Sequence, residues 1–191
     1  FGRDLVNWNN NFTWAKWVTP SRDLISAFKQ EGDEVRFKES IVYYDCNWSN
    51  YYPSDNYPFM YKCRSANSSI IKYRYADVLL LKAEALIMQD TPDLEGAADI
   101  IDEVRDRAKL GALPTSVRSN KNAMLNALLK ERRLELAFEG QRWFDLVRLD
   151  KVEEVMNAVY AKDSGRKAQI YTFDKNSYRL PIPQSVIDAN D

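Results

Sequence analysis

The sequence contains no histidine among its 191 residues. This absence excludes Ser-His-Asp triads, histidine-ligated metal sites and histidine-based acid–base chemistry from the chain. Only two cysteines occur, Cys46 and Cys63, and two thiolates without histidine or further cysteine do not complete a tetrahedral metal site. No run approaches the roughly 18 apolar residues of a membrane-spanning helix. We therefore expect no metal, no cofactor and no membrane span in this chain.

Neither sign of charge is in excess, since 27 lysines and arginines stand against 28 aspartates and glutamates, for a net charge of −1. A nucleic-acid-binding domain normally presents a basic face, so this balance argues against nucleic acid as a partner. Hydrophobic residues make up 45% of the chain, which is enough to build a core in a chain of about one domain's length.

Helical spacing of apolar residues dominates from residue 72 onward. Residues 73–88 and 93–109 each predict one amphipathic helix, and their short link predicts an antiparallel hairpin of about 35 residues, the size of a tetratricopeptide repeat. Thr91 is the expected N-cap of the second helix, with Pro92 at its first position, and Gly111 is the expected stop.

A third, longer helix is expected to begin at Ser119 or Asn120 and to continue past Gly140, where a kink or a close helix approach is expected. Its apolar stripe contains two charged residues, Arg132 and Glu139. A charge on a buried face is tolerated only when it is paired, because an unpaired buried charge costs several kcal/mol. The stripe therefore predicts a buried ionic network.

We assign ten charged residues to this network. Asp77 and Glu84 are expected to meet Arg105 or Arg107 across the hairpin. The full predicted set is Asp77, Glu84, Arg105, Arg107, Glu131, Arg132, Glu135, Glu139, Arg142 and Asp145. Neighbouring arginines stabilise ionised carboxylates, whereas a glycosidase needs one carboxyl group with a raised pKa. We therefore expect structural ion pairs and no catalytic residues.

The remainder of the chain is less regular. A short helix is expected over about 21–30, a strand over 39–44, a Tyr/Ser/Asn/Pro-rich loop over 47–58, a helix over 151–160 and extended chain beyond it. The aromatic residues on helical stripes are expected in the core; these are Tyr75, Phe138, Trp143 and Phe144.

Other aromatic residues lie in polar segments without helical spacing, and the candidate ligand-binding set is Trp8, Trp14, Trp17, Trp48, Tyr51 and Tyr52. Aromatic faces next to asparagine and aspartate suit sugar rings, which offer apolar CH faces and hydroxyl groups. The alternative is that these side chains pack the loops onto the helices.

Three runs of sequence resemble the signature blocks of the SusD/RagB family, in the family's order. Residues 74–86 read RYADVLLLKAEAL, residues 101–108 read IDEVRDRA and residues 130–148 read KERRLELAFEGQRWFDLVR. Asp102 stands where that family usually has asparagine. Weaker similarity flanks these blocks at residues 19–24, TPSRDL, and 180–184, LPIPQ.

The resemblance implies a mainly α fold, with tetratricopeptide-repeat-like helix hairpins, irregular aromatic-rich loops and little β structure. It also implies that residues 1–191 are the C-terminal part of a SusD/RagB-like domain whose export signal and lipid-bearing cysteine lie upstream. Within it we expect a loop-rich, ligand-facing region over 1–70, a helical scaffold over 71–160 and an extended segment over 161–191. In an exported protein there are two alternatives for Cys46 and Cys63: they remain separate thiols, or they form a disulfide.

The function implied by the resemblance is that of a non-catalytic, lipid-anchored protein on the outer membrane surface. Such a protein binds oligosaccharide or polysaccharide and passes it to a SusC-like TonB-dependent transporter. One alternative is RagB-like binding of peptides in the same uptake role. Another, independent of the family, is a helical-repeat scaffold that binds only proteins, although the loops outside the repeats argue against it.

Overall fold

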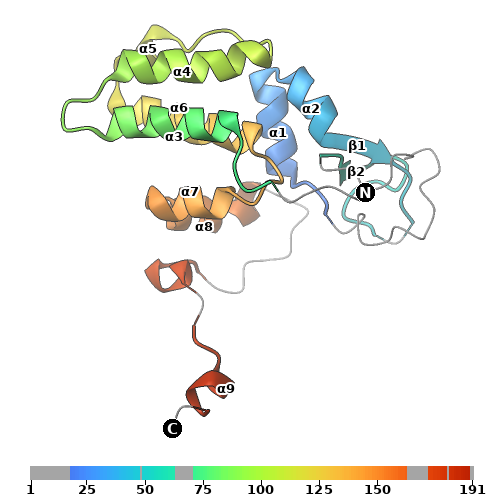
Figure 1. Ribbon diagram of the computed structural model, residues 1–191. Helices are drawn as coiled ribbons and strands as arrows, with labels where there is room; N and C mark the ends of the chain where they lie inside the picture. The colour runs from blue at the N-terminus through green and yellow to red at the C-terminus, as the bar shows by residue number, and fades with distance from the viewer. Residues whose placement is uncertain (1–17, 48, 63–70, 163–171, 180, 190–191) are drawn as a thin grey trace. The chain divides into compact units, whose positions relative to one another are not determined.

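The computed structural model describes residues 18–47, 49–62, 71–162, 172–179 and 181–189. The described chain divides into two compact units, residues 1–142 and 143–191. Helices predominate, and the strands among the described residues form one two-stranded sheet. The predicted mainly α fold with little β structure is confirmed (Figure 1).

The first unit begins with two short helices and a hairpin of strands. Its elements are α1 (Arg22–Glu31), α2 (Glu34–Ser40), β1 (Ile41–Tyr44), β2 (Tyr57–Met60), α3 (Tyr75–Met88), α4 (Leu94–Arg107), α5 (Thr115–Arg118) and α6 (Lys121–Glu135). The strands are antiparallel, with Ile41 opposite Met60 and Tyr44 opposite Tyr57. The sequence pattern did not predict α2, although Asp33 caps it by accepting a hydrogen bond from the Arg36 N–H at 3.1 Å.

α3 and α4 form the predicted antiparallel hairpin, and α6 packs against both (Figure 1). Small residues on the facing sides allow the helices to approach closely, as Ala83 on α3 and Ala97 and Ala98 on α4 are completely buried. The shared core consists of Leu80, Ala83, Ile87, Ala97, Ala98, Ile101, Val104, Leu113, Met124 and Leu128. This three-helix core supports the ionic groups at one end of the hairpin.

The ends of α4 differ from the expectation. Its N-cap is Asp93, whose carboxylate accepts the Gly96 N–H at 2.9 Å, rather than Thr91. The helix ends at Arg107, and the left-handed residue that follows its C-cap is Lys109, with a φ of 60°, rather than Gly111. Hydrogen bonds from the Lys109 and Leu110 N–H groups to the carbonyls of Asp106 and Arg105, at 2.8 and 2.9 Å, complete a Schellman motif.

The prediction of one long helix that continues past Gly140 is wrong beyond Glu135. α6 ends there, and Phe138 and Gly140 follow in left-handed conformations with φ of 67° and 80°. The chain turns at these residues and begins again as α7 (Arg142–Arg148). The turn brings Glu139 beside Glu135 so that both carboxylates reach Arg74.

The second unit contains most of α7, then α8 (Val152–Lys162), η2 (Lys175–Tyr178) and α9 (Gln184–Ile187). The side-chain amide of Asn157 holds the C-terminal segment to α8, because it donates to the Phe173 carbonyl at 2.9 Å and accepts from the Phe173 N–H at 2.8 Å. Residues 161–191 were predicted to be extended, but they include two short helical elements, η2 and α9.

Two aromatic residues that were assigned to the core are exposed. The exposed fraction of Tyr75 is 71% and that of Phe144 is 63%, so these predictions are wrong. Phe138 and Trp143 are half-buried. Tyr75 opens α3 next to the buried Ala76 and Asp77, on the side of the helix that faces solvent. The apolar spacing of α3 continues around the helix, so spacing alone did not identify its buried side.

Candidate functional site

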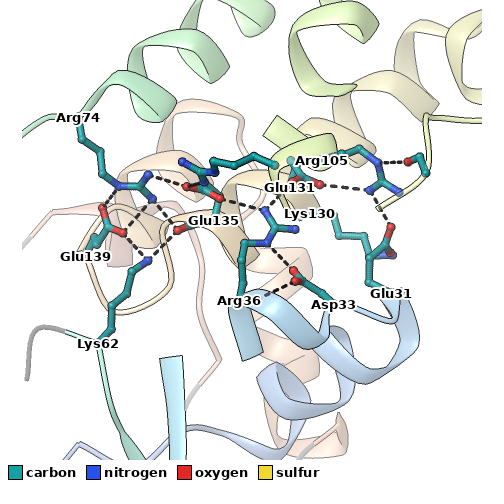
Figure 2. Close-up of polar contacts among 12 residues, drawn as sticks. Glu31, Asp33, Arg36, Lys62, Arg74, Arg105, Lys130, Glu131, Glu135 and Glu139 are labelled. Atoms are coloured by element: carbon teal, nitrogen blue, oxygen red, sulfur yellow. Dashed lines mark hydrogen bonds and ion pairs between the residues drawn. The ribbon is translucent and has the colours of Figure 1, made fainter. Parts of the chain in front are cut away.

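Three glutamates at the end of α6 form the centre of a buried ionic network. Glu131 and Glu135 lie one helical turn apart on α6, and Glu139 lies in the turn that follows (Figure 2). Their side chains are exposed by only 2%, 2% and 3%. Buried carboxylates require cationic partners with good hydrogen-bond geometry, and all three have them.

Arg36 joins α2 to the first two glutamates. Its Nη1 donates to Glu131 at 2.7 Å and to Glu135 at 3.1 Å, and its Nε donates to Asp33 at 2.5 Å. Asp33 thus caps α2 and also orients the guanidinium of the arginine one turn later. Burial lowers the pKa of Arg36, but these carboxylates outweigh it and the pKa is raised, so the side chain stays charged.

Arg74, at the N-cap of α3, joins the second and third glutamates. Its Nη1 lies 2.5 Å from Glu135, and its Nε and Nη2 reach the two carboxylate oxygens of Glu139 at 2.7 and 3.0 Å. Nη2 also donates to the Glu135 carbonyl at 2.6 Å. Lys62 reaches the same place, at 2.5 Å from Glu139 and 2.8 Å from the Glu135 carbonyl.

Two arginines of α4 complete the network. Arg107 forms an ion pair with Glu135. Arg105 donates to Glu131 at 3.2 Å, to Glu31 of α1 at 2.7 Å and to the Gly111 carbonyl at 2.8 Å. The network therefore ties α1, α2, α4 and the start of α3 to the end of α6 (Figure 2).

Two neighbouring carboxyl groups have pKa values shifted in opposite directions. Burial raises the pKa of Glu135, but hydrogen bonds from Arg107 and Arg74 outweigh it and lower the pKa to about 2. Burial also raises the pKa of Glu131, and there the pairs with Arg36 and Arg105 do not overcome it. Glu135 thus stays ionised into the acidic range, whereas Glu131 retains a proton more readily.

Asp77 forms a buried ion pair with Arg132. Its carboxylate lies 2.9 Å from Nη1 of Arg132, which links α3 to α6. The expectation that Asp77 meets Arg105 or Arg107 is therefore wrong, because these arginines turn to the glutamates of α6 and α1. Glu84, two turns further along α3, is also buried.

The last two predicted network members also have polar partners. Arg142 donates to the Leu129 carbonyl at 3.1 Å. Asp145, in the second unit, is buried and accepts from Arg148 at 2.9 Å. Sequence reasoning missed six participants: Glu31, Asp33, Arg36, Lys62, Arg74 and Lys130. Arg74 and Lys130 each begin one of the signature blocks, which was an available signal, whereas the others carry no local pattern.

The loop aromatics pack against Arg22 at the start of α1. The Arg22 guanidinium lies 4.2 Å from the ring centroid of Tyr51 and 4.4 Å from that of Tyr52. The Tyr52 hydroxyl donates to the Pro20 carbonyl at 2.8 Å. The loop is thus fixed to the helix by cation–π contacts and a hydrogen bond. The other candidates, Trp8, Trp14, Trp17 and Trp48, lie outside the described residues.

Cys46 carries a buried, free thiol, and Cys63 lies outside the described residues. Within the described ranges, no group of three or more cysteine, aspartate or glutamate side chains is arranged to hold a metal ion. None of the helices seen there is both long and apolar enough to cross a membrane.

The amino-acid sequence is similar to those of two known proteins. The chain is 42% identical over 99 residues to the SusD-like protein P38 of Formosa agariphila, and 36% identical over 126 residues to the SusD-like protein P2 of that organism. These alignments cover 49% and 63% of this chain but 19% and 24% of the relatives, so the chain spans about a fifth of their length.

A crystal structure of a SusD superfamily protein from Bacteroides vulgatus has the same fold. The superposition of the two structures has a TM-score of 0.64 at 23% sequence identity, and it covers 89% of this chain and 42% of the Bacteroides vulgatus chain. The model of the SusD family matches residues 55–191, which is more than half of the chain. The chain therefore belongs to the SusD family.

Proposed function

We propose that this chain is part of a non-catalytic, glycan-binding protein of the outer membrane surface. The protein would be lipid-anchored and would pass oligosaccharides to a SusC-like TonB-dependent transporter. The observation that carries the proposal is family membership over residues 55–191, because SusD proteins serve nutrient uptake.

The ionic network supports a scaffold rather than a catalytic role. Glycoside hydrolysis by paired carboxyl groups needs a cleft with one carboxyl group of raised pKa and another that faces the substrate. Glu131 has a raised pKa, but its side chain is 2% exposed and both of its oxygens accept from arginines. The network therefore stabilises the helices, and ligand binding falls to the aromatic-rich region over 1–70.

Within that region the four tryptophans are the primary proposed contacts. Tyr51 and Tyr52 each direct one ring face to Arg22, which suits a supporting role that holds the loop in place. Trp14 and Trp48 have asparagines within three residues in the sequence, and these would reach sugar hydroxyl groups.

The test is calorimetry and affinity electrophoresis of the full-length protein with starch, xylan, mucin glycans and peptides. We expect an oligosaccharide to bind, and Trp14→Ala or Trp48→Ala to weaken binding roughly ten- to a hundredfold through lost stacking area. Phe144→Ala, which removes an exposed ring of the second unit, is the matched control and should bind normally.

Two results would count against the proposal. Binding of peptides but of no glycan would favour the RagB-like alternative. Binding of neither class would leave the protein-binding scaffold. Affinity purification from outer membranes tests the partner, and we expect it to recover a large barrel transporter with the tagged protein.

A further inference from the structure

We infer that the α3–α4 hairpin carries a second oligosaccharide-binding site, in which Tyr75 stacks on a sugar ring and Glu103, Asp106 and Arg107 bind its hydroxyl groups. The inference rests on the proposed ligand class but locates a site outside the loop-rich region. The site is a pocket of about 560 Å³ where α3 begins and α4 ends, lined by Arg74, Tyr75, Ala76, Leu79, Glu103, Val104, Asp106 and Arg107.

The size and floor of this pocket suit a ligand. Its volume falls within the roughly 300–1,000 Å³ of small-molecule sites. Ala76 and Val104, which are 5% and 3% exposed, form an apolar floor, and half-buried Leu79 lies beside them. All lining residues come from two helices that pack directly on each other and from the residue before α3, so the shape of the pocket is fixed by the helix core.

Tyr75 provides an aromatic surface at the rim. It is 71% exposed, although a large aromatic side chain usually contributes most of its area to a core or an interface. Its hydroxyl and ring make no hydrogen bond or ring contact within the described ranges. A sugar ring could therefore lie on Tyr75 without displacing another side chain.

The carboxylates of the pocket are available to a ligand. Glu103 and Asp106 are exposed, and neither side chain has a hydrogen bond or ion pair within the part of the chain that the structure describes. The other acidic face of α4 is different, because Arg118 pairs with Glu95, Asp99 and Asp102 there. The carboxylates of Glu103 and Asp106 therefore remain available as acceptors, whereas those of the other face are engaged by Arg118.

The two arginines of the pocket have different roles. Arg74 uses all three guanidinium nitrogens on Glu135 and Glu139, so it forms a fixed wall. Arg107 pairs with Glu135 through Nη2 alone, and its side chain is 59% exposed. Its other N–H groups remain available as donors beside the carboxylates of Glu103 and Asp106.

The charges of the lining identify the ligand class. Two carboxylates and two guanidinium groups balance, so the pocket favours neither a cation nor an anion. It offers both donors and acceptors above an apolar floor, with an aromatic ring at one side. A neutral sugar has the matching features, because its hydroxyl groups donate and accept while its CH face is apolar.

The experiment is NMR titration of the 191-residue chain with maltohexaose, cellohexaose and xylohexaose. We expect at least one sugar to shift the amide signals of Ala76, Leu79 and Val104. Tyr75→Ala should weaken this binding about tenfold, whereas Tyr75→Phe should retain it because the ring remains. Tyr73→Ala is the matched control, since Tyr73 is 76% exposed, lies two residues away and does not line the pocket.

The outcomes separate this inference from the proposed function. Shifts confined to the loop over 49–57, with normal affinity in Tyr75→Ala, would overturn the second site and leave the proposed function standing. Equal losses in Tyr73→Ala and Tyr75→Ala would also overturn it. If none of these sugars binds but the full-length protein binds another glycan, only the site is overturned; if no glycan binds either protein, both proposals fail. Shifts at the pocket with hexalysine instead of a sugar would overturn the ligand class.

Discussion

The guanidinium of Arg132 lies 2.9 Å from the carboxylate of Asp77, and the two side chains are 1% and 4% exposed. The pair joins α6 to α3 across 55 residues of sequence. Both charges have been removed from water, which costs several kcal/mol for each ion, and their mutual attraction offsets that cost only while both are present.

We expect Arg132→Met or Asp77→Leu to lower the free energy of unfolding by about 3–5 kcal/mol, because each removes one member of a buried ion pair. The double variant Arg132→Met/Asp77→Leu should lose much less than the sum of the two single changes. Urea unfolding of the four proteins measures this coupling. Lys38→Ala breaks an exposed pair with Glu34 and should change stability by less than about 1 kcal/mol. The prediction would be contradicted if the single variants lost no more free energy of unfolding than this control.

The stability of the fold should depend on Glu135 under acidic conditions. Its pKa in the folded chain is about 2, below the ordinary value of 4.5. The unfolded state thus binds more protons, so the stabilisation is complete above about pH 4.5 and is lost as the pH falls towards 2. The shift corresponds to roughly 3 kcal/mol. Denaturant midpoints between pH 6 and 3 should fall less steeply in Glu135→Gln than in the wild type.

Glu131→Gln is the matched control for that experiment, because it makes the same change one turn earlier on α6. Burial raises the pKa of Glu131, so its protonation favours the folded state as the pH falls. We therefore expect the acid dependence to steepen, not to flatten, in Glu131→Gln. If the dependence of the denaturant midpoint on pH changes in the same direction in both variants, the pKa values of the two carboxyl groups are not shifted in opposite directions.

The Schellman motif after α4 offers a stabilising substitution. Lys109 has a φ of 60°, a conformation that glycine adopts without the steric cost of a Cβ atom. We expect Lys109→Gly to raise the melting temperature, by an amount corresponding to about 0.5–1 kcal/mol. Lys109→Ala removes the same side chain but keeps Cβ, so it should melt like the wild type. A lower melting temperature for the glycine variant would refute this account of the helix end.

Arg22 should hold the loop that carries Tyr51 and Tyr52. Each cation–π contact contributes about 0.5–1 kcal/mol at a half-exposed site, so Arg22→Ala should cost about 1–2 kcal/mol. Amide hydrogen exchange should also accelerate over residues 49–56. Lys29→Ala changes an exposed cation of the same helix and should leave exchange in the loop unaltered. If amide exchange in the loop is unchanged in Arg22→Ala, contacts other than those of Arg22 hold the loop in place.

Local sequence patterns predicted the helical scaffold well. The spacing of apolar residues placed helices at 73–88 and 93–109, and the structure has Tyr75–Met88 and Leu94–Arg107. Helices of this length bury one side against neighbours, so their periodicity is visible in the sequence. The structure also buries the side chains of Arg132 and Glu139 with ionic partners, as charges within an apolar stripe require.

Features that depend on distant partners were not predictable in the same way. The pairing of Arg36 with Glu131 joins positions 95 residues apart and leaves no trace in the residues around either. The turn at Phe138 was missed because the apolar spacing continues through it, while the ion pairs of Glu139 decide the backbone. The outward orientation of Tyr75 likewise depends on which sides of α3 its neighbours occupy, which spacing does not reveal.

The arrangement around Glu135 bears on the lifetime of the fold as well as on its equilibrium. Two of its arginine partners lie 99 and 61 residues away in sequence, so the chain must close long loops before these pairs can form. We expect such pairs to form after the rate-limiting step of folding. Interactions absent from the transition state slow unfolding and leave the folding rate almost unchanged. The pairs of Glu135 with these arginines would therefore act mainly as a kinetic barrier that lengthens the time each molecule stays folded.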